Sequence, residues 1–221
     1  MMLNVTHIDL GGCEGCSVAL LRAMLNAKNC NFKSRLTGEF DGDGDVVMVS
    51  GPICMNDSEK IEMLKELRKK AKLLIAFGSC AAVGGITRYC RGGQQPKPHH
   101  MTFQPINAVV TVDYAIPGCP PSPRMIQPFM NALASGKQSN YIQIFKAVAE
   151  VKKLSGFDLI DDIVLQNICI SCGACVLSCP TGAMHMVSGK PDLIVEKCIR
   201  CGTCYVRCPR ASQLLIRRYL K

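Results

Sequence analysis

The 221-residue sequence predicts an α/β domain built on a parallel sheet, followed by a small α+β module. Three observations support this prediction. Strand-like and helix-like segments alternate over residues 1–135, short loops with glycine, proline and cysteine follow several predicted strands, and one cysteine pattern occurs twice near the end. We therefore expect a sheet domain at 1–135, a linker with a short helix at 136–160 and a cysteine-rich module at 161–221.

The first strand and helix follow from the spacing of apolar residues. The run at 5–10 predicts a strand. A helix is expected at 17–26, with Leu20, Leu21 and Leu25 on one face, because residues three to four positions apart lie on the same side of a helix.

Short apolar runs indicate the other strands of the sheet domain. The continuous run at 46–49 is typical of a parallel strand covered on both faces. Asp57 or Ser58 can cap the helix that follows it, and the runs at 73–77 and 109–112 predict two more strands. Such alternation places helices on both faces of a parallel sheet, whose ligands bind at the carboxyl ends of the strands.

A repeated cysteine pattern defines the module at 161–221. Both copies have the spacing Cys-x2-Cys-x2-Cys-x3-Cys-Pro, which is the bacterial ferredoxin signature for two 4Fe–4S clusters. The fourth cysteine of each run binds the cluster of the other run. The predicted ligand sets are Cys169, Cys172, Cys175 and Cys208 for one cluster, and Cys179, Cys198, Cys201 and Cys204 for the other.

Zinc knuckles and disulfides are the alternatives for these cysteines. Zinc takes four ligands, usually from paired CxxC units, so a doubled three-plus-one pattern argues against it. A disulfide scaffold is typical of shorter secreted chains. Because cluster ligation needs free thiolates, we expect a reducing, cytoplasmic environment. Neither a signal peptide nor a membrane-spanning run is apparent, so we expect no direct membrane insertion.

The net charge of +9 is concentrated near the C-terminus. From Lys190 onward there are eight basic residues and two acidic ones. A nucleic-acid surface is one interpretation. We favour a docking face for an acidic protein, or compensation for anionic clusters, because no aromatic residues are interleaved to stack on bases.

Four further cysteines follow predicted strands. Cys13 and Cys16 lie in the loop after the first strand, and Cys80 and Cys119 follow later strands. Because the carboxyl ends of parallel strands meet at one edge of the sheet, these loops are expected to converge. Four thiolates at this edge predict a third cluster, most simply 4Fe–4S. A thioredoxin-like pair of Cys13 and Cys16 is the alternative, but it leaves the other two cysteines unexplained.

These loops resemble those of a known family. The segments Cys13-Glu14-Gly15-Cys16-Ser17, Gly78-Ser79-Cys80 and Pro117-Gly118-Cys119-Pro120-Pro121-Ser122-Pro123 are similar to the small subunit of nickel–iron hydrogenases. In that family the four cysteines hold the proximal cluster, beside the nickel–iron centre of a separate large subunit. The segments Gly84-Gly85-Ile86-Thr87-Arg88-Tyr89 and Arg91-Gly92-Gly93-Gln94, with the C-terminal module, resemble the gamma subunit of coenzyme F420-reducing hydrogenases.

The resemblance implies a flavodoxin-like sheet domain followed by a bacterial-type 2×4Fe–4S ferredoxin domain. It also implies the electron-transfer subunit of a cytoplasmic nickel–iron hydrogenase, which works within a higher-order heteromeric complex. Hydrogen would be split at the nickel–iron large (alpha) subunit. Electrons would pass through three 4Fe–4S clusters to a flavin (beta) subunit, whose FAD reduces coenzyme F420. No catalytic residue is expected in this chain, because no nucleophile–base pair is apparent.

Ser50 departs from the family pattern, since many relatives carry an acidic residue there. Some gamma subunits use a carboxylate as a proximal ligand, so Asp57 and Cys54 are reserve ligands behind the four thiolates. Ser50 also leaves open an electron-transfer adapter of a reductase complex without a nickel–iron site. A module of a quinone-reducing respiratory complex is a third hypothesis, but its usual pair of adjacent cysteines is missing from the first loop.

Overall fold

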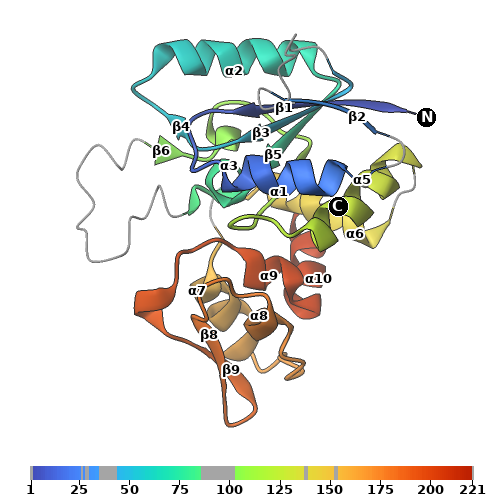
Figure 1. Ribbon diagram of the computed structural model, residues 1–221. Coiled ribbons are helices and arrows are strands. Elements are labelled where there is room, and N and C mark those ends of the chain that lie inside the picture. The colour runs from blue at the N-terminus through green and yellow to red at the C-terminus, as the bar shows by residue number, and fades with distance from the viewer. Residues whose placement is uncertain are drawn as a thin grey trace.

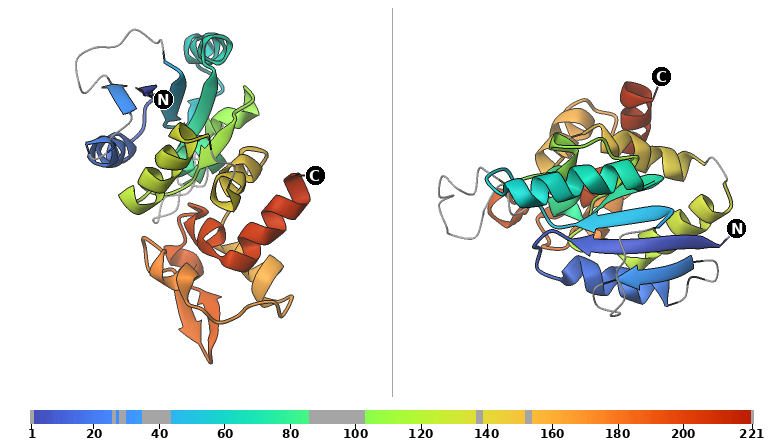
Figure 2. Two further views of the ribbon diagram at one scale, coloured as in Figure 1. Left: turned by 90° about the vertical axis from the view of Figure 1, so that its right-hand side faces the viewer. Right: turned by 90° about the horizontal axis from the view of Figure 1, so that it is seen from above.

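The computed structural model describes residues 2–25, 27, 30–34, 44–85, 103–136, 139–151 and 154–220 (Figure 1). Within these residues the chain forms an N-terminal sheet with flanking helices and a C-terminal module of short elements, drawn in orange and red. Figures 1 and 2 show the module packed against one end of the sheet domain. The fold class predicted from the sequence is confirmed.

The main sheet has five parallel strands. Their order across the sheet is β2-β1-β3-β5-β7, and every neighbouring pair is parallel. Numbered by their sequence within this sheet, the strands follow the order 2-1-3-4-5, which is that of flavodoxin. The strands are β1 (Leu3–Asp9), β2 (Cys30–Ser34), β3 (Val46–Ser50), β5 (Leu73–Phe77) and β7 (Tyr114–Ile116).

Helices cover both faces of the sheet. α2 (Ser58–Lys70) lies on one face, whereas α1 (Gly15–Met24) and α5 (Pro123–Ala134) lie on the other (Figures 1 and 2). Strand β3 is buried along its whole length, as its continuous apolar sequence predicts. A second, two-stranded antiparallel sheet pairs β4 (Ile53–Cys54) with β6 (Phe103–Gln104).

The first helix ends earlier than the sequence predicts. Leu20 is fully buried, but α1 ends at Met24, and its C-cap residue, Leu25, is 77% exposed. Leu20 and Met24 are both buried because residues four positions apart lie on one side of a helix. The helix therefore buries its Leu20 side and turns Leu25 to solvent.

The strand predicted at 109–112 is also absent. η3 (Ile106–Ala108) is a 3-10 helix, and the last strand of the sheet is β7. Between them, the Asp113 amide donates to the Leu74 carbonyl at 2.8 Å, and the Asp113 carboxylate accepts from the Leu74 amide at 2.7 Å. The Asp113 side chain thus accepts a hydrogen bond that a backbone carbonyl of a neighbouring strand would otherwise accept. The apolar run at 109–112 alone does not predict this contact.

α6 (Asn140–Ala149) joins the two parts of the chain. It lies in the segment expected to be a linker with a short helix, and it packs against β7 and against α10 (Pro209–Tyr219). Phe145 of α6 makes an edge-on contact with Phe129 of α5, with ring centroids 5.4 Å apart. Such contacts add to the apolar burial that holds a helix in place.

The module consists of short elements. β8 (Met184–Val187) and β9 (Lys190–Leu193) form an antiparallel hairpin. The other elements are α7 (Gly156–Leu159), η4 (Ile160–Val164), α8 (Ala174–Leu177), η5 (Val195–Lys197) and α9 (Thr203–Arg207), besides α10. Among the residues described here, no helix has the length and apolarity to cross a bilayer.

Candidate iron–sulfur sites

The four strand-end cysteines converge at the carboxyl edge of the sheet. Cys13 and Cys16 follow β1, Cys80 is the second residue of α3 (Ser79–Val83), and Cys119 follows β7. Burial raises the pKa of the Cys16 thiol. Its pKa is raised further by the other three thiols, in the order Cys80, Cys119 and Cys13. The Ser79 amide also donates to the Gly118 carbonyl at 2.9 Å, so the turns that carry Cys80 and Cys119 lie side by side.

Glycine makes the close approach of these loops possible. Gly78, between β5 and α3, has a φ of 86°, and a Cβ added to it would lie 2.3 Å from the Cys16 Sγ. No other residue type both fits this space and adopts the left-handed conformation without strain. Gly78 therefore lets the Cys16 thiol lie directly against the turn that carries Cys80.

Asp9 holds the first cysteine loop to the end of β1. Its Oδ1 accepts hydrogen bonds from the amides of Gly11, at 2.7 Å, and Gly12, at 2.6 Å. The Ser50 hydroxyl donates to Asp9 Oδ2 at 2.5 Å. His7 Nε2 lies 2.9 Å from the same hydroxyl and must donate to it, because the hydroxyl proton is already shared with Asp9.

Asp9 is a site residue that the sequence analysis missed. Burial raises its pKa, but hydrogen bonds from Ser50 and from the amides of Gly12 and Gly11 outweigh that effect, so its pKa is lowered. The Ser50 departure thus places a hydroxyl, fully buried, against a carboxylate from the neighbouring strand. An aspartate at a strand end, two residues before the Gly11-Gly12 pair, was the available signal.

The reserve ligands have other roles in the structure. Asp57 is the N-cap of α2, where its Oδ1 accepts a hydrogen bond from the Lys60 amide at 3.0 Å. Cys54 lies in β4, paired with Phe103 of β6. Neither is among the groups that raise the pKa of Cys119. The four thiols remain the predicted ligand set of the first site.

The structure also brings together the cysteines of each ferredoxin set. One small cavity is lined by Cys179, Cys198, Cys201 and Cys204, and a second by Cys169, Cys172, Cys175 and Cys208. In each case the fourth cysteine comes from the other copy of the pattern. This crossed grouping is the arrangement that two adjacent clusters require.

Both copies of the cysteine pattern have the same backbone conformation. Ser171 and Gly173 have φ values of 54° and 70°, and Arg200 and Gly202 have values of 52° and 73°. Positive φ is unfavourable for Ser and Arg and persists where the surroundings demand it. The guanidinium of Arg200 lies over the Phe157 ring, 4.7 Å from its centroid. The tight loops turn three cysteines of each run toward one point.

The three sets lie in a row. The Ser79 hydroxyl, next to Cys80, donates a hydrogen bond to the Cys201 carbonyl at 2.6 Å. Cys201 also raises the pKa of Cys119, after burial and Cys80. On the other side, Cys175 is among the thiols that raise the pKa of Cys204. The set containing Cys201 therefore lies between the other two sets.

The alternatives for the cysteines fit the structure less well. All the cysteines in the described ranges are free thiols. No three His, Cys, Asp or Glu side chains in these ranges lie close enough to hold a single metal ion, as a zinc knuckle would require. Neighbouring thiols raise the pKa of Cys16 in the first set and of Cys204 in the second, and a bound cation would offset this effect.

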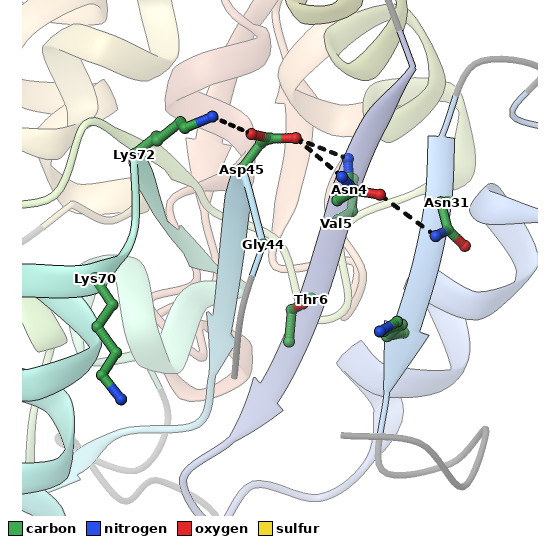
Figure 3. A pocket seen from close by; sticks show the side chains of 9 residues that line it. Asn4, Val5, Thr6, Asn31, Gly44, Asp45, Lys70 and Lys72 are labelled. Atoms are coloured by element: carbon green, nitrogen blue, oxygen red, sulfur yellow. Dashed lines mark hydrogen bonds and ion pairs between the residues drawn. The ribbon is translucent and has the colours of Figure 1, made fainter. Parts of the chain in front are cut away.

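Arg88 and Arg91, in the segments that resemble gamma subunits, lie outside the described residues. A cavity of about 420 Å³ lies at the amino ends of the strands, opposite the cysteine loops (Figure 3). In it, Lys72 pairs with Asp45 at 2.6 Å. No cysteine lines this cavity, so it is separate from the three sets.

Comparison with known families agrees with this geometry. Residues 13–133 match the family described as NADH ubiquinone oxidoreductase, 20 Kd subunit, and residues 137–213 match the 4Fe-4S dicluster domain. Together they define an iron–sulfur electron-transfer protein.

The relatives are more specific. The chain is 34% identical over 215 residues to coenzyme F420 hydrogenase subunit gamma of Methanococcus voltae, covering 86% of this chain and 88% of the relative. It is 35% identical over 207 residues to the same subunit of Methanosarcina barkeri, covering 86% and 80%. The chain belongs to the family of coenzyme F420 hydrogenase gamma subunits. The crystal structure of an NAD+-reducing [NiFe]-hydrogenase is 24% identical and covers 62% of this chain and 94% of its own, with a TM-score of 0.49.

Proposed function

We propose that this chain carries electrons from the nickel–iron site of a large (alpha) subunit to an FAD-containing beta subunit that reduces coenzyme F420. Family membership supports the type of complex. The observation that carries the proposal is the row of three cysteine sets, in which the set containing Cys201 lies between the other two. A row of this kind is what stepwise electron transfer through a protein requires.

Each set would hold one 4Fe–4S cluster, which when bound accepts and releases one electron at a time. The first site would use Cys13, Cys16, Cys80 and Cys119; the second Cys179, Cys198, Cys201 and Cys204; the third Cys169, Cys172, Cys175 and Cys208. The chain's own role is to fix the spacing of these sites and to tune their potentials by hydrogen bonds to sulfur. The Thr203 hydroxyl, 3.3 Å from the Cys201 Sγ, is such a group.

The two ends of the row differ from its middle in exposure. Cys13 of the first set and Cys172 of the third are exposed, whereas Cys198, Cys201 and Cys204 are buried. Exposed apolar side chains lie near both ends of the row. Val18 is near the first set, and Leu177, which is 89% exposed, is near the third. We assign the large subunit to the first end and the flavin subunit to the other.

The setting of the complex follows from the same proposal. It would be a cytoplasmic heteromeric assembly, since thiolate ligands persist in a reducing compartment. Hydrogen activation would take place on the large subunit, with no catalytic residue in this chain. The basic C-terminal segment would face an acidic partner surface rather than nucleic acid.

Metal analysis of the purified complex tests the proposal. We expect about twelve iron and twelve labile sulfide per chain, together with nickel and FAD on co-purifying subunits. Cys80→Ser should remove about four iron, whereas Cys30→Ser, a half-buried cysteine outside the three sets, should remove none. A native complex without nickel would refute the hydrogenase function and favour the adapter hypothesis. About eight iron in the unaltered protein would refute the first site.

A further inference from the structure

Ser79 is a buried serine that joins three cysteine-bearing segments. It is 2% exposed and directly precedes Cys80 at the start of α3. Its amide donates to the Gly118 carbonyl at 2.9 Å, and its hydroxyl accepts from the Gly118 amide at 2.9 Å. The same hydroxyl donates to the Cys201 carbonyl at 2.6 Å.

The amide and the hydroxyl of Ser79 bond to a predicted ligand residue and to the immediate neighbour of another. Gly118 precedes Cys119 of the first set, and Cys201 belongs to the second set. The single hydroxyl proton is used for Cys201, and a lone pair is used for Gly118. Any other rotamer of Ser79 would leave the Gly118 amide and the Cys201 carbonyl without this partner, and unpaired buried polar groups are costly.

A serine at the first turn of a helix often caps that helix, but Ser79 does not. The N-cap position of α3 is Gly78, and no side-chain capping hydrogen bond is formed there. The hydroxyl is directed at the second site, in the module, and not at the amides of its own helix. The hydrogen bond from Ser79 to Cys201 therefore links the segments that carry the first and the second site, which we call the junction of the two sites.

The backbone is also closely packed on the module side of this junction. A Cβ added to Gly202, the residue after Cys201, would lie 3.3 Å from the Leu154 Cβ and 3.4 Å from the Leu154 carbonyl oxygen. With Gly78 against Cys16 on the other side, glycines allow close approach at both sites. Small changes in side-chain length here must move one site relative to the other.

We propose that Ser79 is a positioning residue that sets the spacing of the first and second cluster sites and supplies a bonded route between them. The route runs from Cys80 through the Ser79 hydroxyl to the Cys201 carbonyl. In the step it serves, one site loses one electron and the other gains it, and Ser79 neither gains nor loses a proton. This role rests on the proposed three-site function.

Substitutions in the intact complex test this role. Ser79→Ala removes the hydroxyl, and Ser79→Thr retains it. Ser212→Ala is the matched control, because Ser212 is also buried and its hydroxyl donates to the Val206 carbonyl at 2.9 Å within the module. The measurements are iron content, the magnetic interaction between reduced clusters by electron paramagnetic resonance, and hydrogen exchange of the Gly118 amide.

For Ser79→Ala we expect unchanged iron, a weaker magnetic interaction and roughly tenfold faster exchange of the Gly118 amide, because that amide loses its partner. Ser79→Thr and Ser212→Ala should match the unaltered protein in all three measurements. Full iron with an unchanged magnetic interaction in Ser79→Ala would overturn the proposal.

If Ser79→Ala loses iron, the Ser79→Thr variant tests whether the hydroxyl sets the spacing of the two sites. Full iron with an unaltered magnetic interaction in Ser79→Thr then supports the role of the hydroxyl, whereas a weakened interaction refutes it. Failure of the three-site function itself is distinguishable, because it would appear as about eight iron in the unaltered protein.

Discussion

The sheet domain and the module hold their cysteines in opposite ways. In the sheet domain the core contains large apolar side chains such as Leu20, Met48 and Phe77, and none of the four strand-end cysteines is buried. In the module the cysteines themselves are core residues: Cys175, Cys198, Cys201, Cys204 and Cys208 are all buried. The predicted ligands are thus added to an existing core in one region and form part of the core in the other, beside buried apolar residues such as Leu159, Ile163 and Leu215.

This difference should determine what each region needs in order to fold. The sheet has five strands and helices on both faces, whereas the hairpin strands of the module have four residues each. Small regions of short elements bury little apolar surface to balance the loss of chain entropy. Binding of iron–sulfur clusters at the predicted sites would supply part of the missing free energy of folding.

Removing iron should have the largest effect and should separate the two regions. Under reducing conditions with a chelator, we expect amides in β8, β9 and α9 to lose hydrogen-exchange protection by at least about 1000-fold, because the module loses its core. Amides in β3 and β5 should retain theirs. Equal loss of protection in both regions would contradict the comparison.

A Gly78→Ala substitution should affect the first site alone. The new Cβ would fall 2.3 Å from the Cys16 Sγ at a φ of 86°, so we expect a loss of about four iron, with the module sites retained. Gly136→Ala is the control, since Gly136 also has a positive φ, of 63°, but open space around it. It should keep all iron and lose about 1 kcal/mol of stability at most. Iron loss in the control would show that backbone strain, and not the clash, is responsible.

A Ser50→Ala substitution should have a smaller, pH-dependent effect. It leaves His7 Nε2 and Asp9 Oδ2 without their shared partner, at a cost of about 1–3 kcal/mol in the free energy of unfolding. Because the pKa of Asp9 is lowered in the fold, its contribution to stability is present above its ordinary pKa and is lost as the pH falls through the lowered value. Without Ser50 this acid-side dependence should shrink.

Urea unfolding across the pH range from roughly 3 to 7 measures this effect. Ser17→Ala is the control, because Ser17 is buried but its hydroxyl has no hydrogen-bond partner within the described structure. The control should show no loss of stability. An equal loss in both variants would mean that hydrogen bonding to Asp9 is not the cause.

The sequence predicted what depends on local pattern and on the order of strands. The strand at 73–77 was correct to the residue, since a short run of buried apolar residues allows few alternatives. The predicted grouping of the cysteines rests on ladder spacing and on the rule that strand ends share an edge, and it stays a prediction. These features are encoded within a few neighbouring positions.

What the sequence did not reveal depends on contacts between distant segments. Asp9 and Ser50 are 41 positions apart, and Ser79 and Cys201 are 122 apart. The strand predicted at 109–112 failed because Asp113 bonds to Leu74 of another strand. In each case a polar side chain satisfies backbone or side-chain groups that only the folded chain brings near.

The burial of the inner cysteine set has a consequence for reagents in solution. A dissolved dye or oxidant that reacts on contact can reach Cys13 and Cys172, whereas Cys198, Cys201 and Cys204 are shielded. Chemical damage should therefore begin at the two outer sites and advance inward. If the proposed function holds, the inner site would exchange electrons with partner proteins only through its two neighbours, so loss of either neighbour would interrupt the path.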